Sequence, residues 1–333
     1  MILVTGATGL VGGHLLWHLL QENEQVVALK RTESNLSPLH TIFSFYTNNP
    51  DLYLNKIKWV TGDVLNESSL QNAFQNIDKV YHCAAVVSLG NGSEAMINTN
   101  VLGTKNIVRV ALQANVQKFC FVSSIAACGH ATGNEMIDEY TKWTDSDARS
   151  AYSKSKYYSE AEVWKGVELG LNAIIVNPGV ILGVSGTATG SSQLFTQVQK
   201  GLMFYTNGGS GYVDVKDVVR TMIFLTNSHI KNERYILVGE NCSNKEILSW
   251  MADGFKKQRP WIGVNPEILL IVGFISEITA KIFHFKALID RGMARSATNR
   301  EFYSNKKILT QTSLTFTPIK NCIAEVCTFM LNH

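Results

Sequence analysis

Short apolar runs alternate with longer amphipathic stretches over the first 180 residues of the chain. The apolar runs have the length of buried strands and occupy residues 2–4, 25–29, 57–61, 79–85, 119–124 and 173–176. Stretches with helical spacing lie at residues 10–20, 66–75, 93–114 and 151–169. Strands that alternate with helices predict an α/β fold with a doubly wound parallel sheet, whose strand ends meet at one edge. The polar residues 32–55 interrupt this rhythm and predict a loop with one short helix.

The pattern changes in the second half of the chain. Residues 183–192 are rich in glycine and serine, which is typical of a mobile loop near a ligand. We expect a first domain of residues 1–180, completed by residues 211–240. Residues 181–210 and 241–333 are expected to form a smaller, mostly helical lobe that covers the sheet edge and binds substrate.

A glycine-rich turn separates the first apolar run from the first helical stretch. Gly6, Gly9 and Gly12 follow the spacing Gly-x-x-Gly-x-x-Gly. Glycines here permit a sharp bend, close approach of the backbone to a pyrophosphate, and tight packing of helix on strand. The loop N–H groups and the positive end of the helix then hold the phosphates. This placement predicts a Rossmann-type dinucleotide-binding loop, and the alternative is a plain surface turn.

Two basic residues follow the second apolar run. Lys30 and Arg31 stand where an NAD-binding protein usually has an acidic residue for the ribose 2′-hydroxyl. A cation suits a 2′-phosphate instead. We therefore expect NADP as the cofactor, with NAD as the second choice. The alternative is that both side chains are only solvated.

Residues after two other strands are also suited to a dinucleotide. Asp63 follows the run at 57–61, and its carboxylate suits a hydrogen bond from the adenine amino group. The alternative is a cap for the next helix, for which Asn66 is better placed. Ala84 and Ala85 are small and leave room for the cofactor at the end of the run at 79–85.

Tyr152 and Lys156 lie one helical turn apart, with Cβ atoms about 5–6 Å from each other. A tyrosine with a pKa of about 10 is a poor acid–base catalyst, and lowering it by about three units requires about 4 kcal/mol. We predict that Lys156 lowers the pKa of Tyr152 and binds the nicotinamide ribose. Tyr157 and Tyr158 have no lysine four residues later.

Ser124 completes a candidate catalytic set. It ends the apolar run at 119–124, and its hydroxyl is suited to hold a substrate carbonyl oxygen beside Tyr152. Ser123 points to the opposite face in a regular strand. The order of glycine loop, Ser124, Tyr152 and Lys156 favours a catalytic over a structural interpretation.

Seven segments together resemble one known family. They occur in the order of that family at residues 5–12, 62–64, 82–85, 100–104, 121–124, 152–156 and 177–179. On these segments the chain resembles the extended short-chain dehydrogenases/reductases, also described as the NAD-dependent epimerase/dehydratase family. Arg31 and the segments 177–183 and 212–217 are most similar to the branch of dihydroflavonol reductases and 3β-hydroxysteroid dehydrogenases.

The resemblance implies a Rossmann domain, bound NAD(P) and the roles given above for serine, tyrosine and lysine. It also implies a homodimer formed through the helices that hold Asn100 and Tyr152. The cofactor contacts that it implies come from Thr8, Gly9, Leu10, Val11, Asp63, Val64, Ala84 and Asn100, with Pro178 and Val180 near the nicotinamide. Plant dihydroflavonol reductases carry a substrate-binding asparagine where this chain has Gly129, so a flavonoid substrate is not expected.

The composition sets limits on function. The 333 residues are 45% hydrophobic and 17% charged, with a formal net charge of +3, which gives an ample core and excludes nucleic acid as a partner. The six cysteines form no Cys-x-x-Cys pair, and we expect reduced thiols without a disulfide or metal site. We expect no signal peptide before the first strand and no integral membrane span, since the longest apolar run, 268–275, is too short. These features predict a cytoplasmic protein.

Residues 260–290 carry a wide apolar stripe. It predicts a helical lobe packed over the pocket, and the alternative is an apolar substrate mouth or a membrane-surface patch. The few charges here favour an apolar carbonyl or alcohol over a nucleotide-sugar. His130, Thr132 and Asn134 lie in the loop after 119–124, and His130 is expected to be solvated rather than catalytic.

The sequence thus predicts an NADP-dependent reductase or dehydrogenase of a small apolar substrate. A nucleotide-sugar epimerase or dehydratase that uses the same three residues is the first alternative. A non-catalytic protein that senses NADP is the second, although such a protein has no need of Tyr152 and Lys156.

Overall fold

We describe the fold from a computed structural model of the chain. The structure describes residues 1–22, 24–87, 94–130, 135–145, 149–187, 189–265, 267 and 297–333. Part of the apolar stripe at 260–290, and Thr132 and Asn134 in the loop after Ser124, lie outside the described residues.

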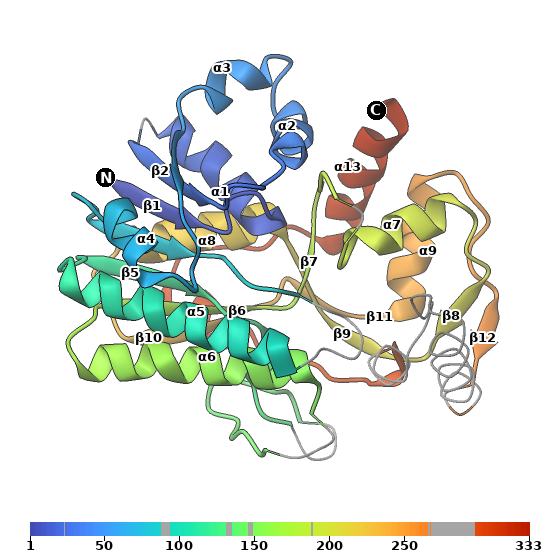
Figure 1. The fold of residues 1–333 in the computed structure, drawn as a ribbon. Coiled ribbons are helices and arrows are strands. Elements are labelled where there is room, and N and C mark those ends of the chain that lie inside the picture. Colours follow the sequence, from blue (N-terminus) through green and yellow to red (C-terminus); the bar gives the residue numbers. More distant parts are fainter. Residues whose placement is uncertain are drawn as a thin grey trace, which may run out of the picture.

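A parallel sheet forms the centre of the fold (Figure 1). In the described chain it has seven strands in the order β10-β6-β5-β4-β1-β2-β3, and every neighbouring pair is parallel. Along the chain these strands are β1 (Ile2–Thr5), β2 (Val26–Lys30), β3 (Lys58–Thr61), β4 (Lys79–His82), β5 (Lys118–Val122), β6 (Ala173–Pro178) and β10 (Glu233–Leu237). The predicted doubly wound α/β fold is confirmed.

Alternation along β1 shows how the two faces of the sheet are covered. Ile2 and Val4 are buried in one core with α1 (Leu10–Gln21) and α8 (Val215–Asn227). Leu3 points the other way and is buried in a second core, because successive side chains of a strand alternate between faces. The helices of this second core are α4 (Glu67–Ala73), α5 (Glu94–Gln113) and α6 (Ala151–Glu168).

A second group of strands, together with α7 (Ser192–Gln199) and α9 (Asn244–Gly254), gathers at one side of the molecule (Figure 1). A small sheet joins β7 (Val180–Leu182), β9 (Gly209–Asp214) and β11 (Glu240–Ser243), and β8 (Phe204–Thr206) pairs with β12 (Ile262–Val264). A third core packs these strands against helices, which are α7 (Ser192–Gln199), α9 (Asn244–Gly254) and α13 (Ile319–Asn332). The boundaries of a substrate lobe stay a prediction.

The region 32–55 differs from our expectation. It forms two helices, α2 (Ser37–Ser44) and α3 (Pro50–Leu54), rather than a loop with one. The reason is tertiary: the ring of Trp17 on α1 stacks on Tyr46 with centroids 4.9 Å apart and meets Tyr53 at 4.6 Å. Such aromatic contacts stabilise short helices that are marginal by themselves.

Three expected absences can be compared with the described residues. All six cysteines are described, and none of them forms a disulfide in the structure. No described group of three or more His, Cys, Asp or Glu side chains is arranged to hold a metal ion. No helix within the described ranges has the length and apolar character needed to cross a bilayer.

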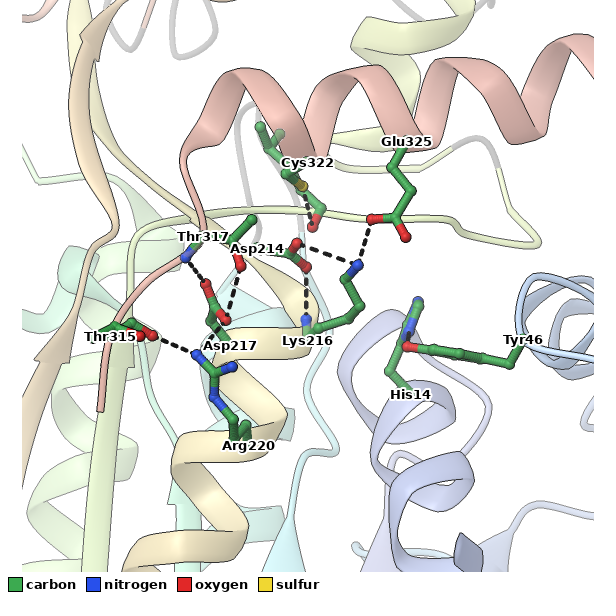
Figure 2. A network of polar contacts seen from close by, with 11 residues as sticks. His14, Tyr46, Asp214, Lys216, Asp217, Arg220, Thr315, Thr317, Cys322 and Glu325 are labelled. Atoms are coloured by element: carbon green, nitrogen blue, oxygen red, sulfur yellow. Dashed lines mark hydrogen bonds and ion pairs between the residues drawn. The ribbon is translucent and has the colours of Figure 1, made fainter. Parts of the chain in front are cut away.

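A polar network at the start of α8 fastens the C-terminal segment to this helix (Figure 2). The buried Asp217 carboxylate accepts hydrogen bonds from the Thr317 N–H (2.5 Å) and the Thr317 hydroxyl (3.2 Å), and it pairs with Arg220 at 2.8 Å. Asp214 caps the same helix by accepting from the Lys216 N–H at 2.8 Å. The Lys216 ammonium then reaches Glu325 on α13. The network therefore joins residues about a hundred positions apart in sequence.

Replacing Asp217 by Ala removes the acceptor of this network and leaves the Thr317 N–H without its partner. We expect the free energy of unfolding in urea to fall by about 2–3 kcal/mol. Glu168→Ala, at the exposed end of α6, is the control and is expected to change it by less than about 0.5 kcal/mol. Equal stability of the two variants would show that the network does not hold the C-terminal segment.

Candidate active site

The order of strands brings the candidate residues to one edge of the sheet. β1, β4, β5 and β6 are consecutive neighbours across the sheet, and all run in the same direction. Their carboxyl ends therefore lie side by side, which is where ligands bind in open α/β sheets. The glycine turn follows β1, the alanines follow β4, Ser124 follows β5, and Pro178 ends β6.

The glycine turn has the geometry of a phosphate loop. Gly6 has a φ of +65°, and a Cβ there would lie 2.5 Å from the Ala84 nitrogen. A Cβ at Gly12 would lie 2.2 Å from the Gly6 carbonyl oxygen, so this glycine allows α1 to pack on the turn. Gly9 is the N-cap of α1 and offers no capping side chain, and the first turn contains no acidic residue. The N–H groups at this helix start therefore suit an anion such as a dinucleotide phosphate.

The alternative role of Asp63 as a helix cap is excluded by the structure. Asn66 caps α4 by accepting from the Ser69 N–H at 3.3 Å, as its position predicted. The Asp63 carboxylate accepts from the Leu65 N–H at 2.9 Å and is half-buried. The carbonyl of the neighbouring Val64 accepts from Asn106 at 3.0 Å. Contacts of Asp63 and Val64 with adenine stay a prediction.

Asn100 positions the loop that follows β4. Its side chain accepts from the Val86 N–H at 2.7 Å and donates to the Val86 carbonyl at 2.9 Å, and it also donates to Ser155 at 3.1 Å. The amide thereby ties the loop to α5 and α6 and fixes the half-buried Ala84 and Ala85 before it. Its implied contact with the cofactor stays a prediction.

The two basic residues after β2 have different surroundings. The Lys30 ammonium lies 6.0 Å from the centre of the Trp59 ring and is half-buried. Arg31 is exposed, and its backbone N–H donates to Ser34 at 3.0 Å. Arg31 is therefore the more accessible cation at the end of β2.

The structure brings Ser124, Tyr152 and Lys156 together. Tyr152 is half-buried in the first turn of α6, and its side chain is hydrogen-bonded to that of Ser124. One turn later, the buried Lys156 ammonium donates to the Val122 carbonyl at 2.8 Å and lies 5.5 Å from the centre of the Phe121 ring. The helix thus presents a phenol and a cation to the end of β5.

The charge states of these groups differ in part from our expectation. Burial raises the pKa of Tyr152, and the hydrogen bond with Ser124 opposes this effect. The predicted lowering of the Tyr152 pKa by Lys156 is therefore wrong, because desolvation of the phenol dominates and the opposing effect comes from Ser124 rather than from Lys156. Burial also lowers the pKa of Lys156 to about 8.

A buried carboxylate, Glu160, was missed by our sequence analysis. It accepts from Ser123 at 2.8 Å and from Asn177 at 3.0 Å, and it pairs with Arg234 at 2.9 Å. Ser123 and Ser124 thus have separate partners. The sequence does contain a signal for Glu160, because this residue follows Lys156 by one helical turn and therefore lies on the same face of the helix.

Other candidates fall around this centre. Pro178 is buried at the end of β6, and Val180 is half-buried in β7.

A Cβ at Gly129 would lie 2.1 Å from the Lys142 carbonyl oxygen, so the asparagine of the plant reductases does not fit here without backbone movement. His130 is exposed and pairs with Glu301, which accords with its exclusion from the catalytic set. Thr8, Leu10 and Val11 are half-buried around the start of α1.

A glycine turn that leads into a helix at the carboxyl edge of a parallel sheet defines a Rossmann-type, NAD(P)-binding protein. The chain belongs to the NAD dependent epimerase/dehydratase family, whose model matches residues 2–239. The family consists of oxidoreductases and epimerases, so the protein is an enzyme of this kind.

Relatives and solved structures agree with this assignment. A Synechocystis sp. protein named after dihydroflavonol 4-reductase is 29% identical over 339 residues, which cover 99% of this chain and 94% of that protein. Cinnamoyl-CoA reductase 1 of Petunia hybrida is 26% identical, with 98% and 90% covered. The crystal structure of the Thermus thermophilus UDP-glucose 4-epimerase complex with NAD is 18% identical, with a TM-score of 0.75 and with 99% and 98% covered. The last similarity shows the fold alone.

Two buried histidines make the fold sensitive to acid. Burial lowers the pKa of His14 and of His82 to about 3. Above pH 6.5 each histidine is neutral in both the folded and the unfolded chain. Below pH 6.5 the histidines of the unfolded chain take up protons, whereas the buried histidines of the folded chain do not. Stability is therefore lost as the pH falls from about 6.5 toward 3.

We expect urea unfolding to show a loss of about 3 kcal/mol per buried histidine between pH 7 and pH 4. His14→Gln, which keeps a donor for the Val184 carbonyl, should reduce this pH dependence. The exposed His40→Gln should leave it unchanged. The same pH dependence in all three proteins would contradict a neutral His14.

Proposed function

We propose that the protein is an NADP-dependent reductase that reduces a carbonyl of a small apolar substrate, or oxidises the corresponding alcohol. The observation that carries this proposal is the contact of the Tyr152 side chain with Ser124, one turn before the buried Lys156. The names of the similar reductases support the same type of reaction.

The three side chains have complementary tasks in such a reaction. Bound NADPH supplies the hydride. Ser124 orients the carbonyl oxygen by a hydrogen bond, and Tyr152 gives this oxygen a proton. Tyr152 lies in the first turn of α6, where the positive end of the helix favours the phenolate that remains. Lys156 adds a cation on the same helix face and is suited to hold the nicotinamide ribose.

The preference for NADP is proposed from the cations at the end of β2. The exposed guanidinium of Arg31 suits a bidentate bond to a 2′-phosphate, and Lys30, which precedes it in the sequence, adds a second positive charge at the end of β2. NAD, which lacks this phosphate, gains nothing from either charge.

Replacing Tyr152 by Phe removes the proposed proton donor while it keeps the ring. We expect NADPH oxidation with a panel of ketones and aldehydes to fall about 10²- to 10⁴-fold. Tyr158→Phe, on the same helix with an exposed hydroxyl that meets Asp145, is the matched control and should retain wild-type turnover. Wild-type turnover of Tyr152→Phe would exclude this role. Tightly retained cofactor and conversion of a nucleotide-sugar without net oxidation would favour an epimerase instead.

Replacing Arg31 by Ala tests the cofactor preference. We expect the Kd for NADPH to rise about 10- to 100-fold and the Kd for NADH to stay the same, because only the former loses a charge-assisted contact. Arg109→Ala, on α5 beside Glu67, is a control for the loss of an exposed arginine. Both Kd values can be measured by titration of the protein with each cofactor, followed by cofactor fluorescence. An unchanged ratio of the Kd for NADPH to the Kd for NADH in Arg31→Ala would contradict the assignment of Arg31.

A further inference from the structure

Glu160 extends the catalytic face of α6 by one more turn. Tyr152, Lys156 and Glu160 are spaced at four-residue intervals, so they share one side of the helix. Glu160 is 3% exposed. A carboxylate taken out of water at this depth requires several donors to offset the loss of hydration.

The structure supplies four donors to this carboxylate. Oε2 accepts from the Ser123 hydroxyl at 2.8 Å and from the Asn177 amide at 3.0 Å. Oε1 accepts from Arg234 Nη1 at 2.9 Å and from Trp164 Nε1 at 3.4 Å. Ser123, Asn177 and Arg234 belong to β5, β6 and β10 or follow them directly, and these strands are neighbours in the sheet. One side chain of α6 is thus bonded to three consecutive strands.

Two of these donors adjoin the candidate catalytic residues. Ser123 precedes Ser124 directly, and the Asn177 amide also donates to the Ser124 carbonyl at 3.0 Å. Asn177 in turn precedes Pro178, the residue expected near the nicotinamide. Glu160 is therefore bonded to the side chains of Ser123 and Asn177 on the two sides of the site, and Asn177 is bonded to the main chain of Ser124.

We propose that Glu160 is a positioning residue, which fixes the main chain of Ser124 and the segment that begins at Asn177 against the helix of Tyr152. This inference rests on the proposed function of Ser124 and Tyr152. The donors Ser123 and Asn177 are those that adjoin Ser124 and Pro178, so the contacts that satisfy this buried carboxylate also bind the two segments that carry the candidate site.

Glu160 also acts on Lys156 through its charge. The Lys156 ammonium is faced by Glu160 on its own helix and by the Cys83 thiol after β4, and its charge is felt by His82 on β4. Burial lowers the pKa of Lys156, whereas the negative charge of Glu160 raises it. Removing that charge should shift the titration of Lys156 to lower pH.

The first test is Glu160→Gln, measured below the Tm of the variant. We expect kcat/KM for the carbonyl substrate to fall about 10- to 100-fold, because small displacements of positioned groups have effects of this size. The limb of the pH profile that reports Lys156 should move to lower pH. Glu162→Gln, two residues away and paired with Lys165, is the matched control and should keep both the rate and the profile.

A milder variant keeps the proposal falsifiable if Glu160→Gln does not fold. Ser123→Ala removes one donor without a change of charge, and we expect a loss of rate with an unshifted pH profile. Where both variants fold, the double variant Ser123→Ala/Glu160→Gln completes the comparison. Its loss of kcat/KM should be smaller than the sum of the two single losses in free energy, because both substitutions break one shared contact. Two results would overturn the proposal. One is a wild-type kcat/KM in Ser123→Ala together with additive effects in the double variant. The other is a wild-type rate and pH profile in Glu160→Gln.

A separate readout distinguishes failure of this proposal from failure of the proposed function. A wild-type protein without turnover on any carbonyl would refute the proposed function. The titration of Lys156 can then be followed by NMR of the protein labelled with ¹³C-lysine, its signal being identified by its loss in Lys156→Met. A midpoint that falls in Glu160→Gln but not in Glu162→Gln supports the link between Glu160 and Lys156, and an unchanged midpoint overturns it.

Discussion

The burial of the Lys156 ammonium is the constraint on which the arrangement of the candidate site depends. Removing a cation from water costs several kcal/mol unless polar groups replace its hydration. Here the Val122 carbonyl, the face of the Phe121 ring and the charge of Glu160 do so. The contacts with Val122 and Phe121 fix the distance between α6 and β5, and Glu160 adds a further link through Ser123, so the position of Tyr152, one turn before Lys156, follows from them.

A second constraint acts at the opposite side of the same edge. The backbone after β1 and the backbone after β4 meet so closely that no side chain fits at Gly6. This contact places the start of α1 beside the alanines after β4, and the buried pair of Thr5 and His82, 2.7 Å apart, holds the two strands together beneath it. The glycine turn after β1 and the loop after β4 are thereby held side by side at this edge of the sheet.

Local sequence patterns predicted the elements of the sheet and most of the candidate site. The strand that leads to Ser124 was expected from its apolar run, and the relation of Tyr152 to Lys156 follows from helix geometry alone. The missed features depend on contacts that are distant in sequence. Phe43 of α2 and Tyr53 of α3 both meet Trp17, and these contacts stabilise the two helices. Glu160 is held by Arg234, 74 residues later. The pKa of Tyr152 depends on burial, which no spacing reveals.

The proposed reductase activity requires that one dinucleotide binds along this edge of the sheet. Its phosphates must lie at Gly6 to Gly12, and its nicotinamide must lie beside Tyr152. A crystal structure of the protein with NADP⁺ measures this directly. We expect the pyrophosphate on the N–H groups at the start of α1, and the Tyr152 hydroxyl and Lys156 ammonium beside the nicotinamide ribose. A dinucleotide bound elsewhere, or a Tyr152 hydroxyl turned away from the nicotinamide, would contradict it.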